Sequence, residues 1–161
     1  MKFSERMQAA INEQINFEMF SANTYLSMSA YFAQQGLDGF AHWYYMQYKE
    51  ELAHAEDMMH YVITRGGKVE IKAVAAVETE FNSPLEIAEK AYHHECLVSE
   101  KIENLVRIAS EEKDMPSQDF FWKYIREQVE EEANATNLID RVRMAEGAAI
   151  LFLDKELAAR Q

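Results

Sequence analysis

The sequence predicts an all-α fold: a four-helix bundle with one long crossover between its second and third helices and a short C-terminal fifth helix. Only five Gly and two Pro occur in 161 residues, so few positions break a helix. Apolar residues recur three and four positions apart through four long stretches, and an aperiodic segment separates the second stretch from the third. The length and an apolar content of 48% suit a single domain, residues 1–161, with the bundle over about 4–145 and the terminal helix over about 148–159.

The first helix is expected to run from Ser4, a typical N-cap residue, to about Gln35. Glu18 interrupts its apolar face. Gly36 should end the helix, and Asp38 is expected to cap the next one. The inward positions of the first helix include Met7, Ile11, Ile15, Ala22, Tyr25, Leu26 and Phe32.

The second helix carries Glu51-Leu52-Ala53-His54 and is expected to stop at residues 65–67. Residues three apart in a helix lie about 4.5 Å apart along the axis and on one face. Glu51 and His54 can therefore hold one metal ion between them. They share this face with Phe40, Trp43, Tyr44, Met58, Tyr61 and Val62, so a carboxylate and an imidazole lie within a stripe that should be core.

Periodicity is lost between Gly67 and Ser83. A connection this long is typical of a crossover, which makes the second and third helices parallel. Ser83-Pro84-Leu85-Glu86 then predicts a helix start, with Ser at the cap, Pro at the first position and Glu at the third.

The third helix is expected to run to about Ala109, with Glu95 on its inner face, and the fourth from about Ser117 to Ala145. Gln128 and Glu131 fall on the inner stripe of the fourth helix. The short helix after Gly147 is apolar nearly all round, which predicts a subunit contact.

Charge and composition exclude several classes of protein. A net charge of −12 argues against direct binding to nucleic acid. The single cysteine, Cys96, excludes a disulfide framework and Cys-rich metal modules, and its role is left open. No apolar run approaches the roughly 18 residues of a membrane span, and the N-terminus lacks the apolar core of a signal peptide. A cytoplasmic protein without a membrane partner is expected.

Each of the four long helices thus presents ligand-type residues at an inward position. Buried carboxylates would repel one another and take up protons unless cations lay among them, and no Lys or Arg lies on these stripes. Oxygen donors with one imidazole suit iron or manganese, and zinc binds similar sets. The competing interpretation is a polar layer that only fixes helix register. One buried Glu would fit that interpretation, but four helices with the same insertion favour a metal pair.

The chain resembles bacterial non-haem ferritins over essentially its whole length. The resemblance rests on the stretches 12–18 (NEQINFE), 50–54 (EELAH), 94–95 (HE), 127–132 (EQVEEE) and 152–157 (FLDKEL). Di-metal bundles of this kind supply Glu from two helices and Glu-x-x-His from the other two. This chain departs in its second motif, Gln128-x-x-Glu131, which resembles ferritins and not bacterioferritins. Leu52 stands where a haem-bearing bacterioferritin has a methionine, so no haem is expected.

The resemblance implies a di-iron ferroxidase centre that oxidises Fe(II) with dioxygen or hydrogen peroxide. Glu18, Glu51 and His54 would hold the first iron. Glu95 and Glu131 would hold the second, with Glu51 bridging and Gln128 at hydrogen-bond range. Tyr25 resembles the tyrosine beside the family's centre, which supplies an electron. The resemblance further implies a third, weaker iron site at the following residues: Glu50, Glu127 and Glu130. By spacing alone these three are solvated-face residues.

The resemblance also implies iron storage in a hollow homo-oligomeric shell of twenty-four subunits. An acidic cation route is expected where the third and fourth helices join, at Glu111, Glu112, Asp114 and Asp119. Two other functions stay open: a ferritin-like di-iron oxidoreductase or peroxidase without a storage role, and a redox-inactive metal buffer. A rubrerythrin-type peroxidase normally needs a Cys₄ iron domain, which one cysteine cannot build.

Overall fold

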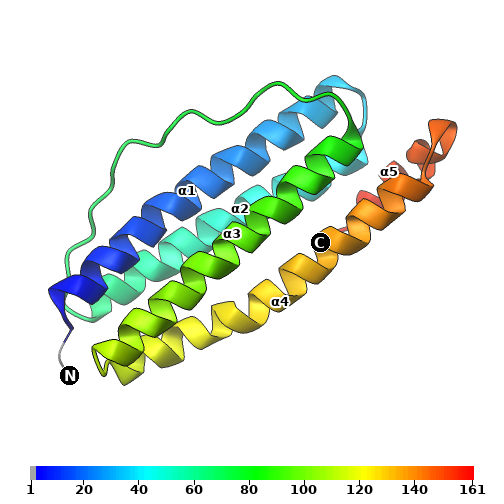
Figure 1. Cartoon of the computed structure of the whole chain (residues 1–161). Helices are drawn as coiled ribbons and strands as arrows, with labels where there is room; N and C mark the ends of the chain where they lie inside the picture. The colour runs from blue at the N-terminus through cyan, green and yellow to red at the C-terminus, as the bar shows by residue number, and fades with distance from the viewer. Residues whose placement is uncertain (1–2) are drawn as a thin grey trace.

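The computed structural model describes residues 3–161, so Met1 and Lys2 of the expected domain lie outside the described residues. The described chain forms four long helices, α1 (Glu5–Gln34), α2 (Asp38–Thr64), α3 (Pro84–Glu111) and α4 (Met115–Met144). A 3-10 turn, η1 (Gly147–Ala149), and the short helix α5 (Ile150–Leu157) follow. The predicted all-α bundle with a fifth helix is confirmed (Figure 1).

The long connection between α2 and α3 runs in an extended path beside α1, so α2 and α3 are parallel (Figure 1). Two asparagines of α1 supply the hydrogen bonds that the extended backbone lacks. Asn12 Nδ2 donates to the carbonyl of Lys68 at 2.8 Å, and Asn12 Oδ1 accepts from the amide of Glu70 at 2.7 Å. Asn16 makes the same pair of bonds with the carbonyl of Glu70 and the amide of Lys72. The crossover is therefore fixed to the bundle by side chains that satisfy its backbone.

The predicted helix starts at Ser4 and Ser83 are confirmed. Ser4 Oγ accepts a hydrogen bond from the amide of Met7 at 3.0 Å, and Ser83 Oγ accepts one from the amide of Glu86 at 3.1 Å. The expected cap at Asp38 is wrong, because α2 already includes Asp38 and its cap residue makes no side-chain hydrogen bond.

The predicted start of the fourth helix at Ser117 is two residues late. Asp114 Oδ1 accepts from the amide of Ser117 at 3.3 Å and caps the helix, which begins at Met115. Arg65 Nη1 holds Asp114 in place at 2.9 Å.

A polar layer divides the hydrophobic core into two clusters. One cluster lies towards the end where α1 begins and includes Met7, Ile11, Ile15, Met58, Val62, Ile102, Leu105 and Phe121. The other lies towards the opposite end and includes Tyr25, Met28, Phe32, Phe40, Tyr44, Ile87, Leu138 and Leu157. Glu18, Glu51, Glu95 and Gln128 are buried at sequence positions between the two sets on each long helix. Packing on both sides thus fixes the level of these polar groups along the bundle.

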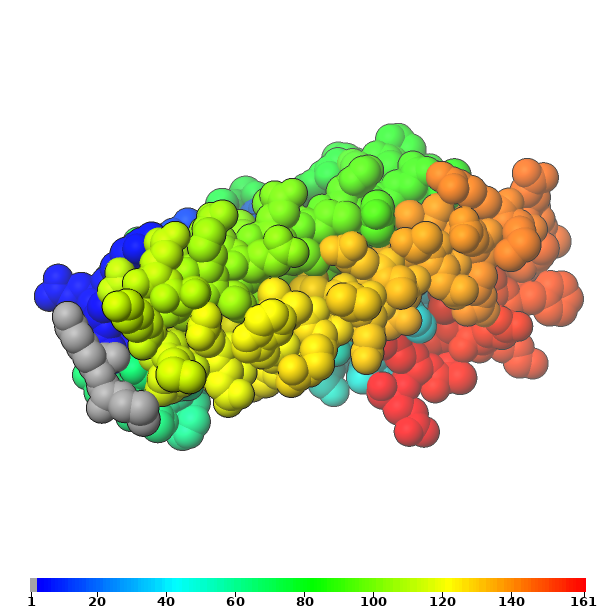
Figure 2. Space-filling model, turned by 60° about the horizontal axis from the view of Figure 1, so that its bottom comes forward, coloured from blue at the N-terminus to red at the C-terminus, as the bar shows by residue number. Residues whose placement is uncertain are grey.

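The terminal helix α5 packs on its own subunit. Leu153 and Leu157 are buried in the second cluster, and Asp154 Oδ1 accepts from the amide of Phe40 at 2.8 Å. A Cβ added at Gly39 would lie 1.6 Å from the carbonyl oxygen of Asp154, so only glycine permits this approach. Figure 2 shows the C-terminal segment in red against the bundle, at the end away from the N-terminus.

The apolar character of this helix therefore reflects packing on its own subunit at Leu153 and Leu157, and the predicted subunit contact is limited to the side chains that stay exposed. Leu151 and Phe152 alone among its large apolar side chains are strongly exposed, at 60% and 75%.

Within residues 3–161, none of the helices is long and apolar enough to cross a membrane.

Candidate metal centre

The first group of ligand-type residues joins α1 to α2. Glu18, Glu51 and His54 each offer an atom within 4.8 Å of those of the other two. His54 Nδ1 lies 3.5 Å from Glu51 Oε2 and 3.9 Å from Glu18 Oε2. Both carboxylates are almost fully buried. Because Glu51 and His54 lie one helical turn apart, their side chains can bind one cation together with Glu18.

Glu95 projects from α3 and is held by two donors from other helices. The Tyr25 hydroxyl of α1 donates to Glu95 Oε1. Gln128 Nε2 of α4 donates to Glu95 Oε2 at 3.0 Å and to the Glu95 carbonyl at 3.2 Å. Gln128 therefore orients the Glu95 carboxylate.

Tyr25 is itself fixed by aromatic neighbours. Its ring stacks with that of Tyr44 at 6.2 Å, and the His94 ring meets it edge-on at 5.6 Å. His94 Nε2 lies 2.7 Å from Ser21 Oγ, and burial lowers the pKa of His94 to about 4. A neutral His94 thus packs behind Tyr25 without adding charge to the centre.

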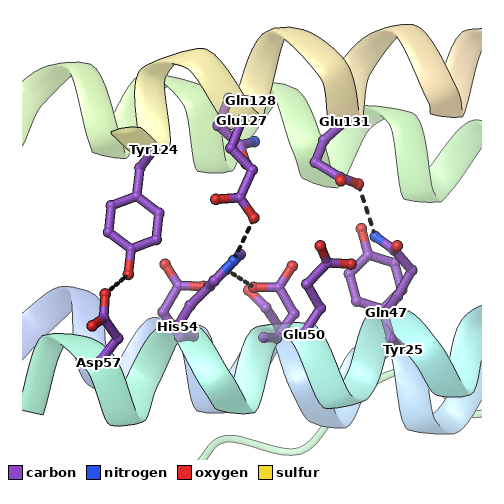
Figure 3. Close-up of polar contacts among 12 residues, drawn as sticks. Tyr25, Gln47, Glu50, His54, Asp57, Tyr124, Glu127, Gln128 and Glu131 are labelled. Carbon is purple, nitrogen blue, oxygen red and sulfur yellow. Dashed lines mark hydrogen bonds and ion pairs between the residues drawn. The ribbon is translucent and has the colours of Figure 1, made fainter. Parts of the chain in front are cut away.

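Glu131 of α4 lies on the far side of the centre and is half-buried. Gln47 Nε2 of α2 donates to Glu131 Oε2 at 3.2 Å (Figure 3). A cavity of about 20 Å³ is lined by Tyr44, Glu95, Glu131 and their neighbours. That volume holds one water-sized molecule.

A second group of three residues lies at the edge of the centre and shares His54. Glu50, His54 and Glu127 offer atoms within 4.8 Å of one another. His54 Nε2 lies 2.7 Å from Glu127 Oε1 (Figure 3). Donation from Nε2 to Glu127 leaves Nδ1 free to bind a cation beside Glu18 and Glu51. Glu130 is exposed and belongs to neither group.

The pKa values of the carboxyl groups show how strongly the centre resists negative charge. Burial raises the pKa of Glu18 well above its usual value, and neighbouring Glu51 adds to the rise. Burial raises the pKa of Glu51 to about 8. Burial, together with Glu50 and Glu95, raises the pKa of Glu131 to about 7.

The pKa values of the other two groups reflect their hydrogen bonds. Burial raises the pKa of Glu95, although the bonds from Tyr25 and Gln128 oppose the rise. Burial acts to lower the pKa of His54, but the bond to Glu127 and the charge of Glu18 outweigh it, and the pKa is raised.

Two buried carboxylate oxygens at the centre of this cluster have no hydrogen-bond partner in the described part of the chain. They are Oε2 of Glu18 and Oε2 of Glu51. A buried oxygen without a donor destabilises the fold unless a cation binds it. Converging oxygens with a neighbouring imidazole nitrogen are a donor set that suits iron, manganese or zinc.

The chain matches the ferritin-like domain family over residues 8–145. The chain belongs to the ferritin family. This ferritin is 48% identical over 157 residues to a bacterial non-heme ferritin of Bacteroides fragilis, and the match covers 98% of this chain and 99% of the relative. It is 35% identical to a probable bacterial non-heme ferritin-like protein of Haemophilus influenzae, over 96% of this chain and 94% of that one. The resemblance to bacterial non-haem ferritins is thereby confirmed.

Solved structures agree with this assignment. This ferritin superposes with a TM-score of 0.97 on the open pore ferritin of the archaeon Archaeoglobus fulgidus, with 45% identity over 99% of this chain and all of the other. A closed form of that ferritin, engineered by site-directed mutagenesis, also gives a TM-score of 0.97, with 46% identity over 99% of both chains.

The structure changes the expected acidic cation route of this ferritin. Asp114 is only 5% exposed and pairs with Arg65, so its assignment to a solvated route is wrong. Glu111 and Glu112 both pair with Arg6, at 2.7 Å and 3.3 Å. These carboxylates join the start of α1 to the turn between α3 and α4.

Several residues around the centre escaped the sequence analysis. Gln14 donates to Glu18 Oε1 at 2.6 Å, and Gln47 bonds to Glu131. Each lies four positions before an inward Glu of its own helix, a spacing that could have indicated both. Arg160 contacts Gln47 and Glu50 from the end of the chain, and no local pattern announces it.

Proposed function

We propose that this protein oxidises Fe(II) at the centre formed by its four long helices and stores the ferric product as mineral inside a hollow shell of twenty-four subunits. The observation that carries the proposal is the pair of buried, unpartnered oxygens on Glu18 and Glu51 beside His54 Nδ1. The family membership and the full-length similarity to non-heme ferritins support it.

We assign one iron position to each end of the group of inward-facing carboxylates. Glu18, Glu51 and His54 would bind the first ferrous ion. Glu95 and Glu131 would bind the second, and Glu51 would bridge. Gln128 and Gln47 orient the second pair of carboxylates through the hydrogen bonds described above.

Iron supplies the redox chemistry, and this chain's residues supply position and charge balance. Two ferrous ions give two electrons, which with two protons reduce dioxygen to hydrogen peroxide or peroxide to water. The protonated forms of Glu51 and Glu131 give up their protons as the cations bind. The cavity beside Glu95 and Glu131, which holds one water-sized molecule, borders the second iron position. Tyr25 donates a hydrogen bond to Glu95 beside the second position, and the family resemblance implies that it is an electron donor.

His54→Ala tests the ferroxidase activity. Protein loaded anaerobically with two ferrous ions per subunit is mixed with oxygen, and the formation of ferric absorbance is followed. We expect the variant to oxidise iron at least about 10-fold more slowly than the wild type, because loss of a ligand exceeds the usual effect of losing an outer hydrogen bond. His60→Ala, an exposed imidazole on the same helix, is the matched control and should keep the wild-type rate.

Equal rates of Fe(II) oxidation in His54→Ala and the wild type would refute the proposed ferroxidase centre. Ferrous uptake without oxidation in the wild type would instead favour a redox-inactive metal buffer. Native mass and iron content after aerobic loading test the storage shell.

The outer residues are proposed to tune turnover and pass iron onward. Replacing Glu50 and Glu130 by Ala should leave oxidation of the first two irons near normal and change the rate of later additions. The structure sharpens this expectation, since Glu127 also orients His54. Glu127→Ala alone should slow the first oxidation by a few-fold. Exposed Glu130 provides the control, and a first-oxidation defect in Glu130→Ala would mean that our division of the site is wrong.

A further inference from the structure

Arg160 lies far from the metal centre in sequence but is anchored beside it in space. The chain turns back at α5, so the C-terminus lies along the side of the bundle (Figure 1). Arg160 Nη1 donates to the carbonyl of Trp43 at 3.1 Å, and its guanidinium lies 4.3 Å from the centre of the Trp43 ring. The Arg160 carbonyl accepts from His42 Nε2 at 2.5 Å. These contacts fix the side chain against α2.

The other end of the guanidinium faces two residues of the centre. Arg160 Nη2 donates to Gln47 Oε1 and to Glu50 Oε2, the latter at 3.0 Å. The side chain of Arg160 is 18% exposed and that of Glu50 34%. The pair therefore lies at the boundary between the bundle and solvent.

The bond to Arg160 decides which way the Gln47 amide points. A guanidinium only donates hydrogen bonds, so the acceptor oxygen of the amide must face it. The amide nitrogen then points to the opposite side, where it donates to Glu131 Oε2 at 3.2 Å. Gln47 is 6% exposed, and its burial leaves little freedom for another orientation.

Glu131 and Glu50 belong to different parts of the centre. Glu131 would bind the second iron, whereas Glu50 is one of the outer group with His54 and Glu127. A guanidinium bound to Glu50 competes with any cation that needs this carboxylate. Arg160 thus contacts Gln47, which supports Glu131 at the second metal position. It also contacts Glu50, which belongs to the outer site.

We infer that Arg160 is a positioning residue of the metal centre: through Gln47 it orients Glu131 for the second metal ion, and through Glu50 it weakens the outer site. The inference rests on the proposed function, because it assigns metal positions to these carboxylates. Arg160, which follows α5, would thus favour binding of two metal ions at the centre over binding of a third at the outer site. A merely structural role in fastening the tail would change all binding steps alike.

Anaerobic titration with Co²⁺ measures the steps separately, by calorimetry and by the visible absorption of the bound ion. In Arg160→Ala we expect the first step to change by less than about twofold, the second to weaken by about tenfold, and the third to tighten. Arg141→Ala is the matched control, because Arg141 pairs with Glu156 of α5 and, within residues 3–161, makes no ion pair with the carboxylates of the centre. It should leave all three steps unchanged.

Two further variants separate the two contacts and do not depend on Arg160→Ala folding. Arg160→Lys keeps a charge for Glu50 but loses the forked geometry, so the second step should weaken while the third stays near normal. Gln47→Leu removes the link to Glu131, and combining it with Arg160→Ala should weaken the second step no further than either change alone.

The inference would be wrong if Arg160→Ala bound Co²⁺ with wild-type affinity at every step, or if all three binding steps weakened equally. Either result would leave the proposed function standing. Wild-type protein that binds no cobalt would overturn both.

Discussion

Glu51→Gln should make the metal-free protein more stable at alkaline pH. Glu51 is 3% exposed, and its Oε2 atom has no hydrogen-bond partner among the described residues. Burial raises its pKa from 4.5 to about 8. Glutamine has nearly the same shape and carries no charge at any pH, so the substitution removes the ionisation and little else.

Proton binding to Glu51 explains why the unfolding free energy falls as the pH rises. Between pH 4.5 and 8 the folded protein holds a proton on Glu51 that the unfolded chain has released. The contribution of this group is therefore fully present below pH 4.5 and is lost as the pH rises to about 8. The raised pKa corresponds to a loss of about 5 kcal/mol of unfolding free energy over this range. For a chain of this size such a loss lowers the melting temperature by about 10 to 20 °C.

The assay is calorimetry of chelator-treated protein at fixed concentration from pH 5 to pH 9. Wild type and Glu51→Gln should melt at similar temperatures at pH 5, and the variant should melt higher by about 10 °C or more at pH 9. Glu56→Gln, an exposed glutamate on the same helix, is the matched control and should follow the wild type. Saturating Zn²⁺ should reverse the order, because the metal stabilises the wild type and the variant has lost a ligand.

Parallel melting curves for wild type and Glu51→Gln across this pH range would refute the reasoning. They would mean that Glu51 remains solvated, and the proposed cation site would lose its main electrostatic argument.

Two further predictions concern the terminal helix and the tyrosine. Gly39→Ala should displace α5, because the new Cβ would meet the carbonyl of Asp154, and native mass spectrometry and melting temperature should both show a weaker assembly; an intact, equally stable shell would contradict the close approach. Tyr25→Phe removes the hydrogen bond that opposes the raised pKa of Glu95, so binding of the second Co²⁺ should shift to higher pH while the first step stays unchanged. An unaltered pH profile would leave Tyr25 without a role in placing Glu95.

The sequence predicted the four long helices well because helix formation depends on local spacing and local hydrogen bonds. The run 84–111 shows this, since Ser83 and Glu86 satisfy the helix start within four residues of each other. The same local geometry put Glu51 and His54 on one face. Loss of periodicity after Gly67 was enough to predict the crossover, because a parallel neighbour cannot be reached by a short turn.

Contacts between distant segments had no such local sign. Asp114 reads as a solvated acid in an acidic turn, yet packing places it against Arg65, 49 positions earlier. The terminal helix reads as unpartnered, yet a glycine in α2 leaves space for it.

The metal centre divides in the same way. Periodicity alone predicted that its carboxylates face inward, since each position repeats with the apolar stripe of its own helix. Only the tertiary structure decided that His54 Nδ1 faces Glu18 and Glu51 while Nε2 faces Glu127, and that Arg160 holds Gln47. These choices depend on the rotation and level of packed helices and on a chain end 113 residues from its partner. Such relations arise when separate elements pack together, and no short stretch of sequence carries them.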